Sequence, residues 1–376
     1  MGRVYYARPN LRHNMELLEI IKQFNINGDI ESVEPFGEGH INDTYLVTCK
    51  NCEIKYVFQR LNTSVFPNYK GVMDNIHLVT SYLRKIIEKE GGDPERETMT
   101  LVLTKDGQNH LFIDGSCYRM SLLIRNTKTY QTVENEGLFQ SSGYAFGKFI
   151  ARLDDFDASQ LVEVIPNFHD TVDRCKKFEE AMCDNKAGRI DNVLPELAFV
   201  EYRKDFMKKI VSSLNKKEIP LRVTHNDTKL NNILMDADTD EAVCVIDLDT
   251  IMPGSLLYDF GDSVRFGCST AKEDEKDLSK VHFDLNLYDI FTKGFLEGIG
   301  DKITKKEVMM LHIGAIMMTL ECGTRFLTDY LNGDTYFKTA YPDHNLVRAR
   351  TQFRLVEEME KNVENMINIA NKYYKN

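Results

Sequence analysis

Residues 225–249 constrain this chain more than any other stretch. Residues 225–232 read H-N-D-T-K-L-N-N, and the apolar run at 243–246 ends on an I-D-L-D sequence. Asp227 fits a base that faces a hydroxyl group, while Asn232 and Asp247 supply the hard oxygen ligands that Mg²⁺ prefers. Phosphoryl transfer from Mg-ATP needs these parts, because the protein mainly orients the attacking hydroxyl and holds metal against the phosphates.

Each of these residues alone has a simpler interpretation, since an Asp in a polar loop is more often a turn residue or a helix cap. The spacing of the set favours the catalytic interpretation. Asp259-Phe260-Gly261 spells the metal motif of protein kinases, but it follows Asp227 by 32 residues. Asp247 follows by 20 residues and ends an apolar run, so we predict it as the metal ligand, with Asp249 as an outer or additional ligand.

Length and composition exclude several classes of protein. A chain of 376 residues is long enough for two lobes with separate cores, and 42% hydrophobic with 28% charged residues is typical of a globular protein. A net charge of -11 and scattered Lys and Arg argue against a nucleic-acid partner. The N-terminus lacks a signal-like apolar run, and the apolar stretch 308–320 is too short to span a bilayer. We therefore expect a cytoplasmic protein without a membrane partner.

The periodicity of apolar residues divides the chain into two parts. After a helix around 17–24, the sequence up to residue 124 is mostly strand-like, with one amphipathic helix at 72–89. Beyond residue 125 helical spacing dominates. We expect an α+β protein with a nucleotide-binding lobe at 1–124 and a helical catalytic and substrate lobe at 125–376. The later expected strands are 99–104, 110–113 and 117–124, and the later expected helices are 144–153, 196–214, 285–296, 305–331 and 346–372.

Cys49 and Cys52 form a C-x-x-C pair that has three interpretations. A zinc site needs a second pair or nearby His ligands, and a thioredoxin-like site needs the motif at the start of a helix. Neither is visible, and the pair lies between strand-like segments at 44–47 and 54–58. A hairpin turn is therefore favoured, and the eight cysteines fit reduced thiols.

The motifs H-x-D-x-x-x-x-N, I-D-x-D and Tyr258-Asp259 together resemble the signature of the aminoglycoside phosphotransferase and choline kinase group. The resemblance implies a protein-kinase-like fold with a five-stranded sheet lobe and a helical lobe. It also implies ATP and Mg²⁺ as cofactors. In that family the acid that matches Asp259 supports the catalytic loop, and we expect the same role here.

Residues 36–45 resemble the glycine-rich loop of such kinases. Gly37 and Gly39 would let backbone amides approach phosphate oxygens. The third strand of a kinase-like sheet normally offers a Lys to the phosphates, yet residues 56–61 read Y-V-F-Q-R-L. Arg60 is the predicted replacement, with Asp74 as a candidate partner, although a solvated edge charge explains Arg60 equally well. Adenine is expected near residues 123–126.

Over both lobes the chain is most similar to the N-acetylhexosamine 1-kinases, through residues 37–42, 58–62, 225–229, 245–254 and 258–265. The resemblance implies phosphorylation of the anomeric C1 hydroxyl of N-acetylglucosamine or N-acetylgalactosamine. It places Lys229 near the transferred phosphoryl group or the sugar. It also implies sugar contacts from His40, Arg325 and Tyr336. Alternatively, Arg325 pairs with Asp329 one turn later, and the other two are ordinary loop residues.

Other functions stay open at this stage. The same fold could phosphorylate choline, homoserine, methylthioribose or an aminoglycoside. The lack of tryptophan favours a neutral sugar over a cationic acceptor. The Gln59-Arg60 segment would suit a nucleotide-binding pseudoenzyme that acts through a partner. A protein kinase is disfavoured, because the H-R-D and A-P-E motifs are absent. The sequence leaves the preferred hexosamine and the oligomeric state undecided.

Overall fold

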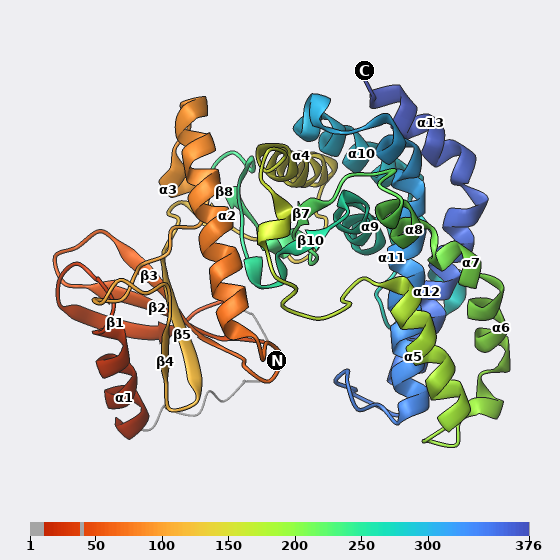
Figure 1. Cartoon of the computed structure of the whole chain (residues 1–376), viewed down its shortest axis with the longest axis horizontal. Coiled ribbons are helices and arrows are strands. Elements are labelled where there is room, and N and C mark those ends of the chain that lie inside the picture. Colours follow the sequence, from red (N-terminus) through yellow and green to blue (C-terminus); the bar gives the residue numbers. More distant parts are fainter. Residues whose placement is uncertain (1–10, 38–40, 376) are drawn as a thin grey trace. The chain divides into compact units, whose positions relative to one another are not determined.

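The computed structural model describes residues 11–37 and 41–375, and only the backbone of residues 11–15. The chain divides into two compact units, Met1–Arg125 and Asn126–Asn376, which we describe separately. Figure 1 shows a sheet with helices α1 to α3 in the first unit and a largely helical second unit. This mixed α+β architecture is the one predicted from the sequence.

The first unit is built on a five-stranded antiparallel sheet of order β1-β2-β3-β5-β4, which confirms the expected five strands. Phe58 of β3 lies at the centre of its core, with Phe24 packed edge-on at 5.9 Å between ring centroids. The elements are α1 (Leu11–Ile21), β1 (Ile30–Pro35), β2 (Asp43–Cys49), β3 (Lys55–Leu61), α2 (Tyr69–Glu90), α3 (Pro94–Glu97), β4 (Leu111–Ile113) and β5 (Ser116–Leu122).

Two local predictions in this unit have clear outcomes. The C-x-x-C pair belongs to the hairpin between β2 and β3, and both thiols are free, as expected. The expected strand at 99–104 is wrong, because this segment forms only single bridges, from Thr104 to Phe24 and from Leu101 to Ser121. Its backbone bonds change partner along the segment, so no continuous ladder forms.

The second unit contains two small antiparallel sheets among its helices. One sheet has the order β6-β8-β9 and the other pairs β7 with β10. The strands are β6 (Thr127–Lys128), β7 (Arg222–Thr224), β8 (Ile233–Asp236), β9 (Ala242–Val245) and β10 (Met252–Gly254). The helices of four residues or more are α4 (Glu136–Arg152), α5 (Thr171–Asp184), α6 (Leu194–Tyr202), α7 (Lys204–Met207), α8 (Lys209–Asn215), α9 (Leu256–Gly267), α10 (Leu285–Ile299), α11 (Lys305–Asn332), α12 (His344–Lys361) and α13 (Val363–Tyr373).

Two helices expected from periodicity are divided in the structure. The segment 196–214 forms α6, α7 and α8, and the expected helix at 346–372 breaks at Asn362 into α12 and α13. The apolar stripe nevertheless continues across the second break, since Met359 and Met366 are both fully buried. Periodicity reports which face of a segment is buried, and it does not report whether the backbone hydrogen bonds continue.

Helices α4 and α10 cross at glycines. A Cβ atom at Gly143 or Gly147 of α4 would lie 2.5 or 2.2 Å from a carbonyl oxygen of α10, and one at Gly294 or Gly298 of α10 would lie 2.0 or 2.2 Å from a carbonyl oxygen of α4. These distances are below van der Waals contact, so only glycine permits the crossing. This matters for the site, because Phe146 of α4 packs against the ring of His225.

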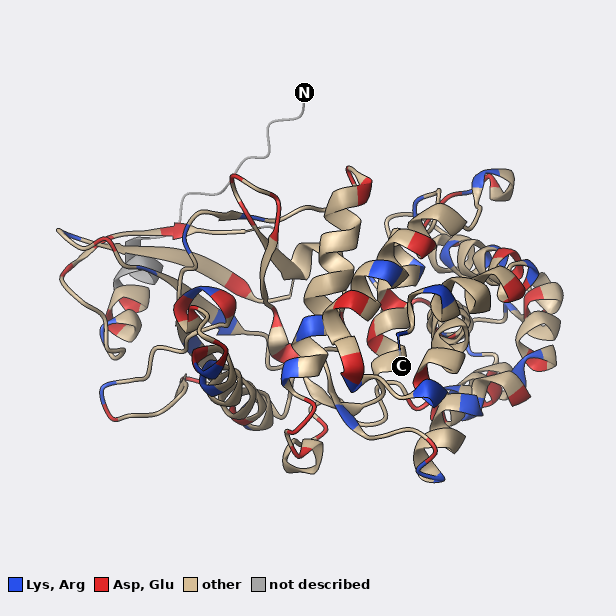
Figure 2. Cartoon of the chain, turned by 90° about the horizontal axis from the view of Figure 1, so that it is seen from above, with Lys and Arg blue, Asp and Glu red and all other residues tan. Residues whose placement is uncertain are grey.

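Charged residues of both signs are interspersed along the described elements (Figure 2), and no helix in the described part of the chain is long and apolar enough to cross a membrane.

We predict that Gly294→Ala destabilises the second unit by about 1–3 kcal/mol, because the added methyl group must push α4 and α10 apart. Thermal unfolding should show a melting temperature several degrees lower than that of the wild-type protein. Gly137→Ala is the matched control, since a Cβ atom there meets only the Asn135 side chain at 3.4 Å. Equal melting temperatures for the two variants would contradict this account of the crossing.

Candidate active site

The carboxylate of Asp259 holds the loop that follows β7. Its two oxygens accept hydrogen bonds from the backbone N–H groups of His225 and Asn226, each at 2.8 Å. Asp259 lies in α9 and is 1% exposed. Burial raises the pKa of Asp259, while the His225 ring and the two N–H groups act in the opposite direction. The supporting role expected for this acid is therefore seen in the structure, and the D-F-G sequence in α9 is a structural anchor.

His225 links the loop to the end of β9. Its Nδ1 accepts the backbone N–H of Asp227 at 3.3 Å, so the proton lies on Nε2, which donates to the carbonyl oxygen of Ile246 at 2.8 Å. The ring is fully buried. Because Ile246 precedes Asp247, this one side chain fixes the backbone at Asp227 relative to the backbone at Asp247.

Asp227, Lys229 and Asn232 are in direct contact. Lys229 Nζ lies 2.8 Å from one carboxylate oxygen of Asp227, and Asn232 Nδ2 donates to the other at 3.1 Å and to the Asp227 carbonyl at 2.7 Å. Partial burial lowers the pKa of Lys229, but the charges of Asp227 and Asp262 outweigh burial and hold the pKa above its usual value. Lys229 therefore stays protonated beside the carboxylate.

Asp247 is brought to the same place by the pairing of β8 with β9. Ile246 N–H donates to the carbonyl oxygen of Asn232 at 2.9 Å, which joins the residue before β8 to the residue after β9. Asp247 has φ 59°, a left-handed conformation that Asp tolerates better than most residues and that is common at functional sites. Asp249 follows in a short 3-10 turn and is buried.

The residues of this site fit Mg²⁺, which is usually held by one or two protein ligands together with water and phosphate oxygens. Asn232 directs its amide nitrogen at Asp227, so its Oδ1 and the Asp247 carboxylate are the atoms suited to the metal. Among the described residues, no group of three or more His, Cys, Asp and Glu side chains could hold a metal alone.

The predicted nucleotide residues belong to the first unit. Gly37 has φ 79°, a backbone conformation that favours glycine, while Gly39 and His40 lie outside the described residues. Arg60 forms an ion pair with Asp43, which lies directly opposite it across β2 and β3. The suggested pairing of Arg60 with Asp74 is therefore wrong, since strand register supplies a nearer acid.

Arg325 and Tyr336, the predicted acceptor residues, lie together in the second unit. The Arg325 guanidinium carbon is 6.0 Å from the Tyr336 ring centroid, and both residues line a cavity of about 150 Å³. Asp329 does not pair with Arg325. Its carboxylate instead accepts the backbone N–H groups of Thr335, Tyr336 and Phe337. The ion pair between Arg325 and Asp329, which their spacing in the helix allowed, therefore does not form.

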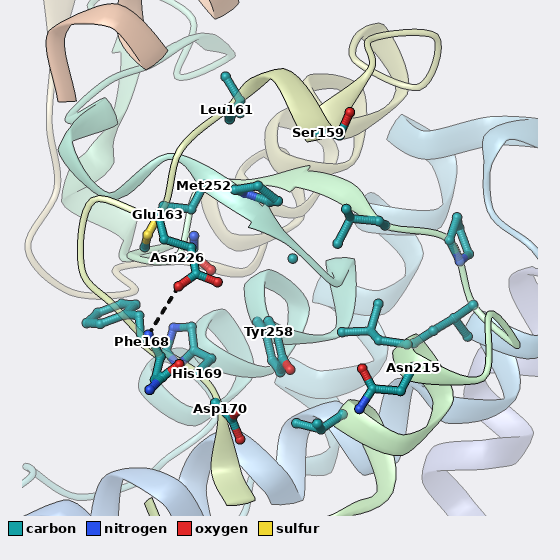
Figure 3. A pocket seen from close by; sticks show the side chains of 18 of the residues that line it. Ser159, Leu161, Glu163, Phe168, His169, Asp170, Asn215, Asn226, Met252 and Tyr258 are labelled. Atoms are coloured by element: carbon teal, nitrogen blue, oxygen red, sulfur yellow. Dashed lines mark hydrogen bonds between the residues drawn. The ribbon is translucent and has the colours of Figure 1, made fainter. Parts of the chain in front are cut away.

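A larger cavity of about 820 Å³ adjoins the loop, and Figure 3 shows the labelled side chains around it. Asn226 and Tyr258 line it next to residues of the 159–170 segment. His169 is 9% exposed, packs on Tyr258 at 5.1 Å between ring centroids, and places Nδ1 3.0 Å from the Glu321 carboxylate. Its Nε2 has no hydrogen-bond partner among the residues that the structure describes.

Sequence reasoning missed His169, Glu321 and Arg174. Glu321 is 1% exposed, and Arg174 Nε lies 3.6 Å from it. These residues come from separate segments that only the fold brings together, and none belongs to a motif. The weak signal in the sequence is the presence of an acid in the middle of the apolar helix α11.

Comparison with known proteins adds independent evidence. Residues 133–280 match the phosphotransferase enzyme family, APH. This segment contains the loop after β7, strand β9 and helix α9. The match supports the resemblance to the aminoglycoside phosphotransferase and choline kinase group over that segment, and it includes Asp227, Asn232, Asp247 and Asp259.

Solved structures show the same protein-kinase-like fold over nearly the whole chain. A microcompartment-associated aminopropanol kinase aligns with a TM-score of 0.61 and 14% identity, covering 94% of this chain and 98% of its own. The ethanolamine kinase of Plasmodium vivax gives 0.57 and 12%, covering 93% and 91%. A spectinomycin phosphotransferase in complex with ADP and spectinomycin gives 0.56 and 13%, covering 93% and 98%.

We predict that Asp259→Asn disorganises the loop, because an amide NH₂ would face one of the two backbone N–H donors and leave it unpaired. A buried unpaired donor costs about 1–3 kcal/mol. The melting temperature should fall by several degrees, and the turnover rate should fall by more than about tenfold as Asp227 loses its position. Asp301→Asn, which changes an exposed acid in the same unit, is the control. If Asp259→Asn changed neither the stability nor the turnover rate, Asp259 would not anchor the loop.

Proposed function

We propose that this chain is an ATP-dependent kinase that transfers the γ-phosphoryl group to the anomeric C1 hydroxyl of an N-acetylhexosamine. The products are the sugar 1-phosphate and ADP. The observation that carries the proposal is the contact between Asp227 and Asn232 on a loop held by Asp259, with Asp247 joined to Asn232 through strand pairing. The family match over residues 133–280 supports the reaction class.

Asp227 acts on the acceptor in this mechanism. Its carboxylate accepts a hydrogen bond from the acceptor hydroxyl, aligns the oxygen with the γ-phosphorus, and takes the proton late in the transfer. Lys229, which lies 2.8 Å from the same carboxylate, offsets negative charge that develops on the transferred oxygens. The hydrogen bond from Asn232 fixes the orientation of the carboxylate.

The metal ligands are expected in the second unit, and candidate residues for the nucleotide phosphates in the first. Asn232 and Asp247 would hold Mg²⁺, which when bound neutralises charge on the phosphates, and Asp249 would support or extend that ligand set. Gly37 and Gly39 would bring backbone N–H groups to the phosphates. Arg60 is the proposed cation of the third strand, in the ion pair with Asp43.

Support for a sugar acceptor is narrower. Arg325 and Tyr336, carried over from the resemblance together with His40, line one cavity, although they belong to different segments. An exposed aromatic ring beside a guanidinium suits a polar ring with hydroxyl groups. The chief alternative is another small alcohol, such as an amino alcohol or an aminoglycoside, because the aligned structures include kinases that carry those names.

The direct test incubates the protein with Mg-ATP and N-acetylglucosamine or N-acetylgalactosamine and follows the products by phosphorus NMR. We expect an acid-labile phosphate on C1. ADP formed only with an amino alcohol or an aminoglycoside would keep the kinase and reject the sugar. ADP formed with none of these acceptors would leave the pseudoenzyme interpretation as the stronger one.

We predict that Asp227→Asn lowers kcat by about 10²–10⁴-fold while ATP binding is nearly unchanged, because only the group that accepts the proton is lost. Steady-state kinetics and calorimetric titration with an ATP analogue measure the two effects. Asp301→Asn, at an exposed acid in the 3-10 turn after α10, should behave as wild type. Near wild-type turnover in Asp227→Asn would refute the assignment of the base.

We also predict that Asp247→Asn raises the Mg²⁺ concentration needed for half-maximal rate by about tenfold or more, because a charged oxygen ligand becomes neutral. The rate at saturating ATP, measured over a Mg²⁺ series, gives this value directly. Asp301→Asn again serves as the control. If the Mg²⁺ requirement stayed the same, Asp247 would have no part in holding the metal.

A further inference from the structure

The small cavity beside Arg325 gathers positive charge. It has a volume of about 150 Å³ and lies between α5, the C-terminal turns of α11 and the segment that follows α11. Arg174 and Lys177 of α5 and Arg325 of α11 line it, and Asp329 is the single acid among its lining residues. The cavity is too small for a whole ligand, but it has room for one substituent of a ligand.

Arg325 has no hydrogen-bonded acidic partner among the described residues. Glu321, one turn earlier in α11, interacts with it through charge alone and is shared with His169 and Arg174. In the part of the chain that the structure describes, it makes no hydrogen bond and no ion pair. Its guanidinium carbon instead lies 5.6, 6.0 and 5.5 Å from the ring centroids of Phe168, Tyr336 and Phe337. Aromatic faces attract a cation but accept few of the five N–H donors of a guanidinium. These donors are therefore available to a ligand.

Arg174 is only partly paired. Its Nη2 donates to the carbonyl oxygen of Phe168 at 2.7 Å. Its Nε is buried without a hydrogen bond in the described part of the chain and forms an ion pair with Glu321 at 3.6 Å. Burial and then the charge of Arg325 lower the pKa of Arg174, while the charge of Glu321 acts in the opposite direction. Two guanidinium groups thus share the one carboxylate of Glu321, and an anion bound between them would offset the remaining positive charge.

The nearby acids are already engaged. The Asp329 carboxylate accepts three backbone N–H groups and the side-chain amide of Asn345 at 2.9 Å. Lys177 pairs with Asp173 at 2.6 Å, and Glu321 pairs with His169 at 3.0 Å. The Asp329 and Glu321 carboxylates keep their negative charge, but their oxygens face other donors. No acid among the described residues is therefore hydrogen-bonded to Arg325.

The cavity is connected to the catalytic loop through contacts within the second unit. Phe168, whose ring lies near Arg325, is followed by His169. The ring of His169 packs on Tyr258, and Tyr258 precedes the Asp259 carboxylate that holds His225. The larger cavity is lined by Phe168, His169 and Tyr258, which places the same segment beside both cavities.

We propose that this cavity binds a negatively charged substituent of the acceptor, such as a carboxylate or a sulfate. The inference rests on the proposed kinase function and narrows its substrate class to acidic N-acetylhexosamines. Arg325 and Arg174 donate charge-assisted hydrogen bonds to the anion, and guanidinium groups suit planar or tetrahedral oxyanions. The aromatic rings around Arg325 keep its guanidinium oriented.

The test is calorimetric titration without nucleotide. The ligands are N-acetylglucosamine, its 6-sulfate, its 3-O-carboxyethyl ether and inorganic sulfate. At least one acidic sugar should bind about tenfold or more tightly than the neutral sugar, and Arg325→Gln and Arg174→Gln should each remove the difference. Lys176→Gln, at an exposed cation of the same helix, should preserve it. Melting temperatures show whether each variant is folded, and two variants are used because Arg174 also binds the Phe168 carbonyl.

Three outcomes would overturn the proposal. They are equal binding of acidic and neutral sugars, an acidic preference that persists in both folded variants, and binding of inorganic sulfate without any gain for the acidic sugars. The last result would mean that the cavity takes a free anion only. ADP release measured with the same sugars tests the kinase function separately. Absence of ADP with every sugar would reject that function, while the titration would still decide the preference for an anion.

Discussion

The site depends on one buried carboxylate that holds two consecutive backbone N–H groups. Asp259 receives the N–H of His225 and of Asn226, and Asn226 adopts a left-handed conformation with φ 64°. Asn tolerates that conformation better than most residues. The direction of the chain at Asp227 follows from this arrangement, because Asp227 is the next residue.

Further contacts connect this loop to the rest of the site. His225 joins the loop to the residue before Asp247, and Phe146 of α4 packs against its ring. Glycines on both helices allow α4 to approach α10 closely. On the other side, Arg222 of β7 forms a buried ion pair with Glu307, which caps the start of α11. The polar site therefore rests on tightly packed helices.

The balance of charge differs between the surroundings of Asp227 and those of Arg325. Near Asp227, one cation is paired with the proposed base, so the carboxylate is oriented and partly neutralised. Near Arg325, two guanidinium groups share one buried carboxylate, that of Glu321, and aromatic rings surround Arg325. The first arrangement suits proton and phosphoryl transfer. The second suits the proposed anionic substituent, since two cations with one carboxylate keep a net positive charge.

The five-stranded sheet was implied by the family resemblance, whereas the residues themselves determined the α+β division and the spacing that joins Asp227, Asn232 and Asp247. Those features are local, because they follow from apolar periodicity and from a short motif across one strand pair. Only the tertiary structure decided that Arg60 pairs with Asp43, that 99–104 is no strand, and that Arg174 meets Arg325. The physical reason is that strand register and helix packing bring together residues far apart in the chain, and periodicity carries no information about such partners.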